Sequence, residues 1–194
     1  MRYKVKTAPV LFPAALDDVK RNVHIDTADI DTDRDALLND LIKDAITASQ
    51  NATGRQYCRA TFYLYMDAYP EGGEIEITAG PVAAITSVKY LAPGATELST
   101  LDPSKYQLDS IELTARLRFL ESFSVDCSRM NVIEIEFTNG WTTAADVPAD
   151  IKQAVVLRAC ESYLHPENPT VNHGIGLRTT IAEIKEKDYK VQRF

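Results

Sequence analysis

The stretch from Asp33 to Gly54 constrains this chain most, because its pattern fits a long amphipathic helix and no strand. Apolar and small residues recur there at three- and four-residue steps: Leu37, Leu38, Leu41, Ile42, Ala45, Ile46, Ser49 and Ala52. A helix of roughly twenty residues is about 30 Å long, enough to cross a small domain. We expect Thr32 or Asp33 to cap its first turn, and Gly54 to close it in a left-handed conformation.

Two further helices are predicted on either side of this one along the chain. Residues 16–23 have helical spacing with acidic residues in the first turn, but Ala14 and Ala15 stand where a capping Ser or Thr would help. After Pro148, placed at the first helical position, a more apolar stripe begins. It consists of Ile151, Ala154, Val155, Ala159, Ser162 and Tyr163. We expect this helix to be buried against the long one.

Between the long helix and the helix that follows Pro148, the hydrophobic period changes from 3.6 residues to 2. Six segments alternate in hydrophobicity or have the length and composition of short strands: residues 62–67, 74–77, 85–90, 106–109, 115–120 and 132–138. The predicted fold class is therefore α+β, with an antiparallel sheet of five to seven strands, meandering or sandwich-like. We predict a single domain, residues 1–194, with a helical core of residues 12–56 and 147–165. Residues 57–142 are predicted to form a β-rich insertion between the two long helices. Residues 166–194 are predicted to form a C-terminal arm, and residues 1–15 an extended lead-in.

Composition limits the partners that this chain can have. Its formal net charge is −7, from 28 acidic and 21 basic residues, and no stretch gathers Lys and Arg as a DNA-gripping surface requires. An acidic surface can still let DNA pass. No apolar run is long enough to span a membrane, so a soluble protein made in the cytoplasm is expected. The cysteines, Cys58, Cys127 and Cys160, are odd in number and widely spaced, which favours buried free thiols.

An acidic loop is the one cluster that suggests a site. Its carboxylates are Asp26, Asp29, Asp31, Asp33 and Asp35. The alternate spacing is similar to a calcium loop, but Arg34 occupies the position that needs Gly and Asp40 replaces the bidentate Glu. We therefore predict helix-start acids, with no metal and no cofactor.

A nucleophile pair of Cys160 and His165 fits by spacing, yet Cys160 lies on the apolar helix, where an inert buried thiol is expected. No catalytic residues are predicted.

Three segments, taken in order, resemble a known family. They are Leu16–Lys20 with Val23–Asp26, the Leu37-to-Ala45 pattern leading into Thr53-Gly54-Arg55, and Gly140-Trp141 followed by Val147-Pro-x-x-Ile151-x-x-Ala154. Together they are similar to the head–tail connector (adaptor) proteins of tailed bacteriophages and prophages, in particular the long members with a β-rich insertion. The chain departs from that family at Ala15, where a Ser or Thr cap is usual, and at His24 and Gln50, where Arg and Glu are common.

This resemblance implies a structural virion protein without enzymatic activity. It implies a dodecameric homo-oligomeric ring that docks on the portal protein, extends the DNA channel and meets a tail-side stopper or completion protein. DNA would pass through without specific binding and no membrane would be involved. The protein would be found in the virion neck, and in the host cytoplasm before assembly. The acidic loop would lie at a subunit interface or in the channel.

The C-terminal arm is the expected portal or subunit contact. Its apolar anchors are Ile181, Ile184, Tyr189, Val191 and Phe194. Within the arm only Ile181 and Ile184 indicate a helical turn. A tail that orders on a partner offsets its ordering entropy at assembly. The alternative is a tail that packs on its own domain or frays.

Three other functions fit the sequence. The first is a tail-completion or neck protein that does not bind the portal. The second is a β-domain that binds carbohydrate or peptide through Tyr63, Tyr65 and Tyr69. The third is a metal-assisted hydrolase that uses the carboxylates between Asp26 and Asp35.

Overall fold

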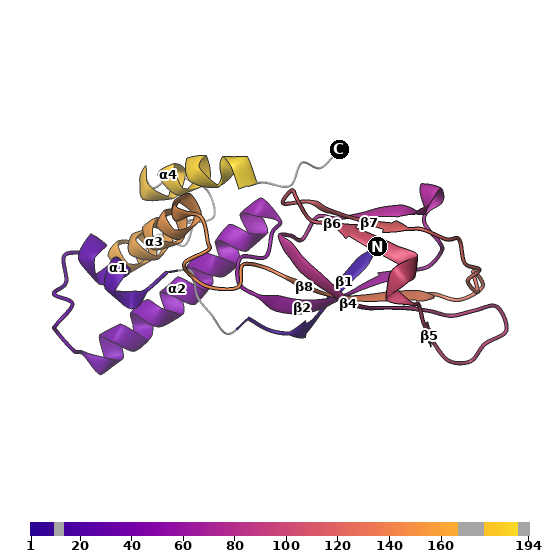
Figure 1. Cartoon of the computed structure of the whole chain (residues 1–194). Coiled ribbons are helices and arrows are strands. Elements are labelled where there is room, and N and C mark those ends of the chain that lie inside the picture. Colours follow the sequence, from indigo (N-terminus) through magenta and orange to yellow (C-terminus); the bar gives the residue numbers. More distant parts are fainter. Residues whose placement is uncertain (10–13, 167–176, 190–194) are drawn as a thin grey trace. The chain divides into compact units, whose positions relative to one another are not determined.

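The computed structural model describes residues 1–9, 14–166 and 177–189 (Figure 1). The chain separates into two compact units, a β unit of Met1–Val10 and Arg59–Trp141 and a helical unit of Leu11–Cys58 and Thr142–Phe194. Helices and antiparallel sheets both occur, which confirms the α+β class. In sequence order, strands β2 to β8 come between helices α2 and α3. That all of this forms a single domain stays a prediction.

The predicted long helix is α2, Thr32–Thr53. It begins one residue earlier than expected, so the prediction that Thr32 or Asp33 caps it is wrong. The cap is Asp31, which has extended backbone angles and whose side chain accepts a hydrogen bond from the Arg34 amide at 3.1 Å. Gly54 closes the helix at φ 70°, as predicted, and its amide donates to the Gln50 carbonyl at 2.8 Å.

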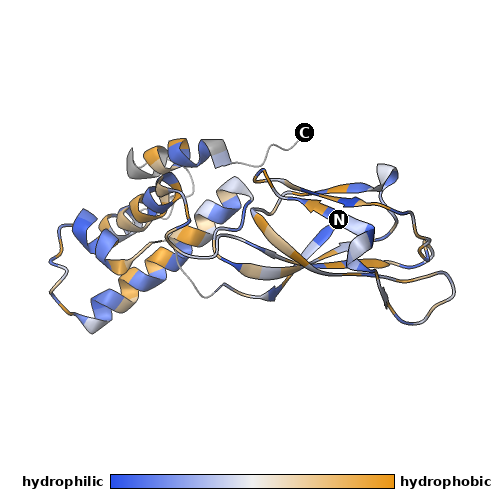
Figure 2. Ribbon diagram, in the orientation of Figure 1, coloured by the Kyte–Doolittle hydropathy of each residue, from blue (hydrophilic) through white to orange (hydrophobic). Residues whose placement is uncertain are grey.

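The core of the helical unit lies among α2, the short helix α1, Leu16–Asn22, and helix α3, Ala149–Leu164. Its fully or almost fully buried side chains include Val19, Leu38, Ile42, Ile46, Val155, Ala159 and Cys160. Leu37 and Ala52 were predicted on the same stripe but are exposed, so the packed stripe is narrower than the apolar pattern. Figure 2 shows apolar and polar residues interspersed along α2 and α3, as amphipathic helices require.

The start of α1 agrees with the prediction, and the start of α3 differs from it by one residue. Ala15 stands at the start of α1 without a side-chain capping bond, as expected. Pro148 is the N-cap of α3 and not its first helical residue. This shift by one position leaves the physical reason intact, since a proline, which has no amide donor, is tolerated at the start of a helix.

The β unit contains two antiparallel sheets. The five-stranded sheet has the order β1-β2-β8-β4-β5, and the three-stranded sheet has the order β3-β7-β6. The bounds of the first sheet are β1 Arg2–Thr7, β2 Ala60–Met66, β8 Ile133–Asn139, β4 Val82–Tyr90 and β5 Ser99–Thr100. Those of the second are β3 Glu74–Ile77, β7 Ala115–Phe119 and β6 Tyr106–Asp109.

The two sheets share one core, so the sandwich alternative holds. Leu64 and Ile135 from the first sheet and Ile75 and Leu117 from the second belong to the same buried cluster. The extended lead-in is also corrected: residues 2–7 are strand β1, which pairs with β2 from Arg2 opposite Tyr65 onward. Strand β5 was not predicted either, because two residues carry no periodic signal.

Candidate interaction surfaces

The C-terminal helix α4, Leu177–Glu186, packs against α3 (Figure 1). A buried ion pair joins the two helices. Arg158 Nη2 lies 2.8 Å from Glu186 Oε2, and Arg158 Nε donates to Glu186 Oε1 at 3.2 Å. The two side chains are only 6% and 0% exposed. Ala182 is the fully buried apolar residue of α4 within the part of the helix whose side chains are described. Among the described side chains of α4, the buried ones are therefore one alanine and one carboxylate.

The predicted apolar anchors of the arm divide into two groups. Ile181 and Ile184 lie on α4 and are 36% and 66% exposed, so they do not carry the packing on α3. Tyr189 follows in a short 3₁₀ turn, Lys187–Tyr189, and its carbonyl accepts a hydrogen bond from Arg55 Nε at 2.6 Å. Val191 and Phe194 lie outside the described residues. The sequence indicated only a helical turn at Ile181 and Ile184, whereas the structure has a helix of 10 residues.

The acidic loop is organised by one buried lysine. Lys20, on α1, is almost completely buried, and its ammonium lies 2.8 Å from both carboxylate oxygens of Asp35 on α2. The same ammonium donates to the Asp29 carbonyl at 3.0 Å. Arg34 pairs with the Asp29 carboxylate at 2.9 Å, and this hydrogen bond raises the pKa of the Arg34 guanidinium. The loop is thus held from two sides by cations of its own unit.

The other loop carboxylates also have local structural roles. Asp26 accepts a hydrogen bond from the Ala28 amide at 2.9 Å in a side-chain turn, and Asp31 caps α2. Asp33 is exposed in the first turn of α2, where the helix dipole favours negative charge. Within the described residues no cluster of three His, Cys, Asp or Glu side chains is arranged to hold a metal ion. The role of Lys20 was not predicted from the sequence, because an isolated Lys on a short helix is expected to be exposed to solvent.

Two of the three thiols are buried. The Cys160 Sγ donates to the Val19 carbonyl at 3.9 Å inside the helical core, at zero exposure. Cys58 is also buried, and burial raises the pKa of its thiol to about 11. Cys127 is exposed. Two of the three cysteines are therefore the buried free thiols that the sequence predicted.

The tyrosines proposed for a β-domain cleft do not come together. Tyr63 and Tyr65 lie on β2 with ring centroids 5.9 Å apart. Tyr69 packs elsewhere, with its ring centroid 5.0 Å from that of Phe123 and 5.6 Å from that of Phe119. This aromatic cluster, which also includes Tyr90, belongs to the sandwich core, and no single cleft collects the three tyrosines.

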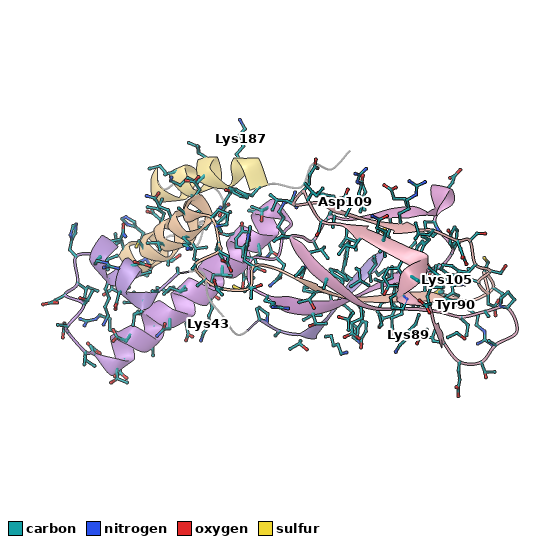
Figure 3. The ribbon with its side chains drawn as sticks, viewed as in Figure 1. Lys43, Lys89, Tyr90, Lys105, Asp109 and Lys187 are labelled. Carbon is teal, nitrogen blue, oxygen red and sulfur yellow. The ribbon has the colours of Figure 1, made fainter. Side chains whose placement is uncertain are left out.

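A charged depression of about 520 Å³ covers part of the three-stranded sheet. Arg116 forms an ion pair with Asp109 at 2.7 Å, and this hydrogen bond holds the pKa of the Asp109 carboxyl below its usual range. Asp109 lies at the end of β6 (Figure 3). Glu74 also faces Arg116, at 3.9 Å. Because these charges neutralise one another, we interpret the depression as a solvated face of the sheet and not as a binding site.

Comparison with known proteins gives a match in structure alone. No protein-family model matches the chain, and no curated protein matches it by sequence. Among solved structures, a chain from the neck of an empty gene transfer agent (GTA) particle, computed with C6 symmetry, is similar with a TM-score of 0.78 and 20% identity. That match covers 100% of this chain and 97% of the other.

Two further structures agree with the first. A chain from the virion of a native GTA particle has a TM-score of 0.79 at 20% identity, and one from the neck of a native GTA particle, computed with C12 symmetry, has 0.66 at 19%. Both matches cover 100% of this chain and 97% of the other. None of the helices that the structure describes has a stretch both long and apolar enough to cross a bilayer. The chain therefore has the fold of chains found in the neck and virion of GTA particles.

Proposed function

We propose that this protein is a structural component of the head–tail neck of a phage or phage-like particle, where it forms a homo-oligomeric ring. The observation that carries this proposal is the similarity over the whole chain to chains from GTA necks. It agrees with the resemblance to head–tail connector proteins that three separate segments of the sequence support. Helices α1, α2 and α3, which carry most of those segments, pack together in one unit, whereas Gly140-Trp141 belongs to the β unit.

The ring is proposed to be a dodecamer docked on the portal. The C12 symmetry with which one similar neck was computed supports this number of copies. An acidic chain of net charge −7 is suited to a channel that DNA must pass without being held, because its 28 acidic residues outnumber its 21 basic residues and repel phosphate. The acidic loop is proposed to face the channel or a neighbouring subunit, held in shape by Lys20 and Arg34.

Portal docking is assigned to the C-terminal arm. Ile184 and Ile181 on α4 offer apolar surface that the described packing on α3 leaves exposed, and such surface is typical of interface cores. Val191 and Phe194 extend this set of anchors in sequence. Deletion of residues 190–194, or the substitution Ile184→Asp, is expected to weaken portal binding and to leave the helical unit folded.

The experiment that tests the function is native mass spectrometry of the protein alone and mixed with its cognate portal. A ring-sized oligomer, or a monomer that joins the portal in stoichiometric number, supports the connector function. A neck oligomer that ignores the portal and binds the tail tube would instead indicate a tail-completion protein. A monomer indifferent to both partners would contradict the proposal.

A further inference from the structure

Strand β1 is exposed to solvent along its whole length. It is an edge strand of the five-stranded sheet and pairs with β2 alone. All six of its residues, Arg2–Thr7, are exposed. Natural proteins commonly shield such an edge, because its unpaired backbone groups and side chains invite another chain to bind. Here the shielding is incomplete, so β1 is a candidate contact surface.

The two sides of β1 differ in chemistry. Tyr3 and Val5 stand opposite Leu64 and Phe62 and so face the sandwich interior, yet they are 39% and 51% exposed. The ring of Tyr3 meets that of Phe137 edge-on at 6.2 Å. These side chains form an apolar shelf that the second sheet does not cover fully.

The opposite side of β1 is basic. Lys6 pairs with Glu136 at 2.7 Å, and Arg2 lies 4.0 Å from Asp67. Lys4, between them, has no ion pair among the described residues. β1 therefore combines an exposed apolar shelf with at least one ammonium that lacks a counter-charge in its own unit.

The loop between β6 and β7, residues 110–114, offers the complementary groups. Ile111 is 93% exposed, the highest value among the large apolar side chains that the structure describes, and Glu112 beside it is exposed as well. The loop is held in place at its base, because the Ile111 amide donates to Asp109 Oδ1 at 3.3 Å and Asp109 pairs with Arg116. A fixed loop that presents an apolar side chain next to a carboxylate is suited to binding.

One of the two surfaces is an edge strand of the five-stranded sheet, and the other is a loop that follows an edge strand of the three-stranded sheet. Strand β5 ends the five-stranded sheet opposite β1, and residues 101–105 lead directly from β5 into β6, which is itself an edge strand. A contact between β1 of one copy and the β6–β7 loop of another therefore joins two unlike surfaces. Such heterologous contacts repeat from copy to copy and close into a ring when the rotation permits.

We propose that the β6–β7 loop of one copy docks on β1 of the next, with Ile111 on the shelf of Tyr3 and Val5 and with Glu112 near Lys4. The occupant is thus a second copy of this chain, chosen by its matching apolar side chain and its opposite charge. This contact supplies one part of a larger subunit interface, and it rests on the proposed ring.

Disulfide trapping in the full-length chain tests this contact. In a Cys127→Ser background, which removes the exposed native thiol, Val5→Cys and Ile111→Cys are combined and the protein is oxidised mildly. Because the contact joins unlike surfaces, the double variant is expected to give a ladder of covalent multimers up to ring size. Each single variant is expected to give none, since a disulfide needs both thiols within bonding distance. Dimers from Val5→Cys alone would overturn the proposal by showing a like-with-like contact.

A charge exchange gives an independent readout. Lys4→Glu and Glu112→Lys are each expected to weaken ring formation by about fivefold per contact, as the loss of roughly 1 kcal/mol implies. The double exchange is expected to restore it, and Glu97→Lys, an exposed acid in another loop, serves as the matched control. The proposed contact is wrong, and the proposed function stands, if the wild type forms rings but two results fail. These are the ladder of covalent multimers from the double cysteine variant and the restored ring formation in the double charge exchange. If the wild type forms no ring alone or on the portal, the proposed function itself fails.

Discussion

The ammonium of Lys20 lies 2.8 Å from both carboxylate oxygens of Asp35, in a site where the lysine side chain is only 3% exposed. This contact joins α1 to the first turn of α2 across the acidic loop. Because the same ammonium also binds the Asp29 carbonyl, it fixes the loop backbone as well. A buried ammonium is stable only when charged or polar partners replace its water shell. The loop carboxylate and carbonyl are those partners, which is why the loop is part of the fold.

Replacing Lys20 tests this role. Lys20→Met keeps the side-chain length but leaves the Asp35 carboxylate without its cation, so the free energy of unfolding should fall by roughly 3 kcal/mol. Urea unfolding measures the change. Lys43→Met is the matched control, because Lys43 pairs with Asp40 on the exposed side of α2, where the loss should stay within about 0.5 kcal/mol. Equal effects of the two substitutions would contradict a special role for Lys20.

The buried pair of Arg158 and Glu186 gives a second prediction. Glu186→Ala leaves the Arg158 guanidinium buried without its carboxylate, so α4 should detach more readily from α3. A loss of about 3 kcal/mol corresponds to roughly a hundredfold faster amide exchange in α4, while α2 and α3 keep their protection. Hydrogen exchange read by mass spectrometry measures this.

Its control is Lys185→Ala, which removes the more exposed pair with Asp150 from the same helix. This variant should exchange within a few-fold of the wild type. Unchanged protection of α4 in Glu186→Ala would show that contacts other than the ion pair hold the helix.

Neither of these two ion pairs was predicted from the sequence. Lys20 and Asp35 are 15 residues apart, and Arg158 and Glu186 are 28 apart. Each of these charged residues fits the hydrated side of an amphipathic helix when read alone. Burial of a charge depends on a partner brought by tertiary structure, and no periodic signal marks that partner. The acidic loop was therefore recognised as structural, but the lysine that organises it was not.

Elements with strong local signals were predicted well. The 3.6-residue period and Gly54 predicted α2. Strict alternation of apolar and polar residues predicted β8, where every second residue is buried. Strand β1 was missed because its partner, β2, lies more than fifty residues away and its own residues are all exposed. Helix α4 was underestimated for a related reason, since its contacts with α3 use Glu186 and a small residue, Ala182. The order of strands within the sheets could not be predicted, because pairing is a non-local property.

Gly80 provides a test of the packing within the β unit. A Cβ atom at this position would overlap the carbonyl oxygen of Leu113, which is backbone and cannot turn aside. Gly80→Ala should therefore lower the free energy of unfolding by roughly 2 to 3 kcal/mol, as overpacking in a core does. Thermal or urea unfolding measures it.

Gly94→Ala separates overlap from backbone strain. Gly94 has φ +76° but open space around its Cβ position, so alanine there meets only the conformational penalty of about 1 kcal/mol. A loss at Gly80 no larger than that at Gly94 would mean that the Leu113 segment can move away.

Alkaline pH should destabilise the helical unit through Tyr57 and Cys58. Burial raises the pKa of the Cys58 thiol to about 11 and also raises the pKa of the Tyr57 hydroxyl. In the unfolded chain these groups lose their protons at about pH 8.5 and pH 10. Between those values and the native ones the unfolded state binds fewer protons, so the free energy of unfolding falls as pH rises.

For Cys58 alone the loss between pH 8 and pH 10 should be about 2 kcal/mol. Urea unfolding of the wild type and of Cys58→Ala at both pH values isolates it, because the variant lacks this titration and keeps all others. The difference in stability between the two proteins should shrink by that amount as pH rises. A difference that stays constant would mean that the native thiol ionises as easily as the unfolded one, and that its burial does not protect its proton.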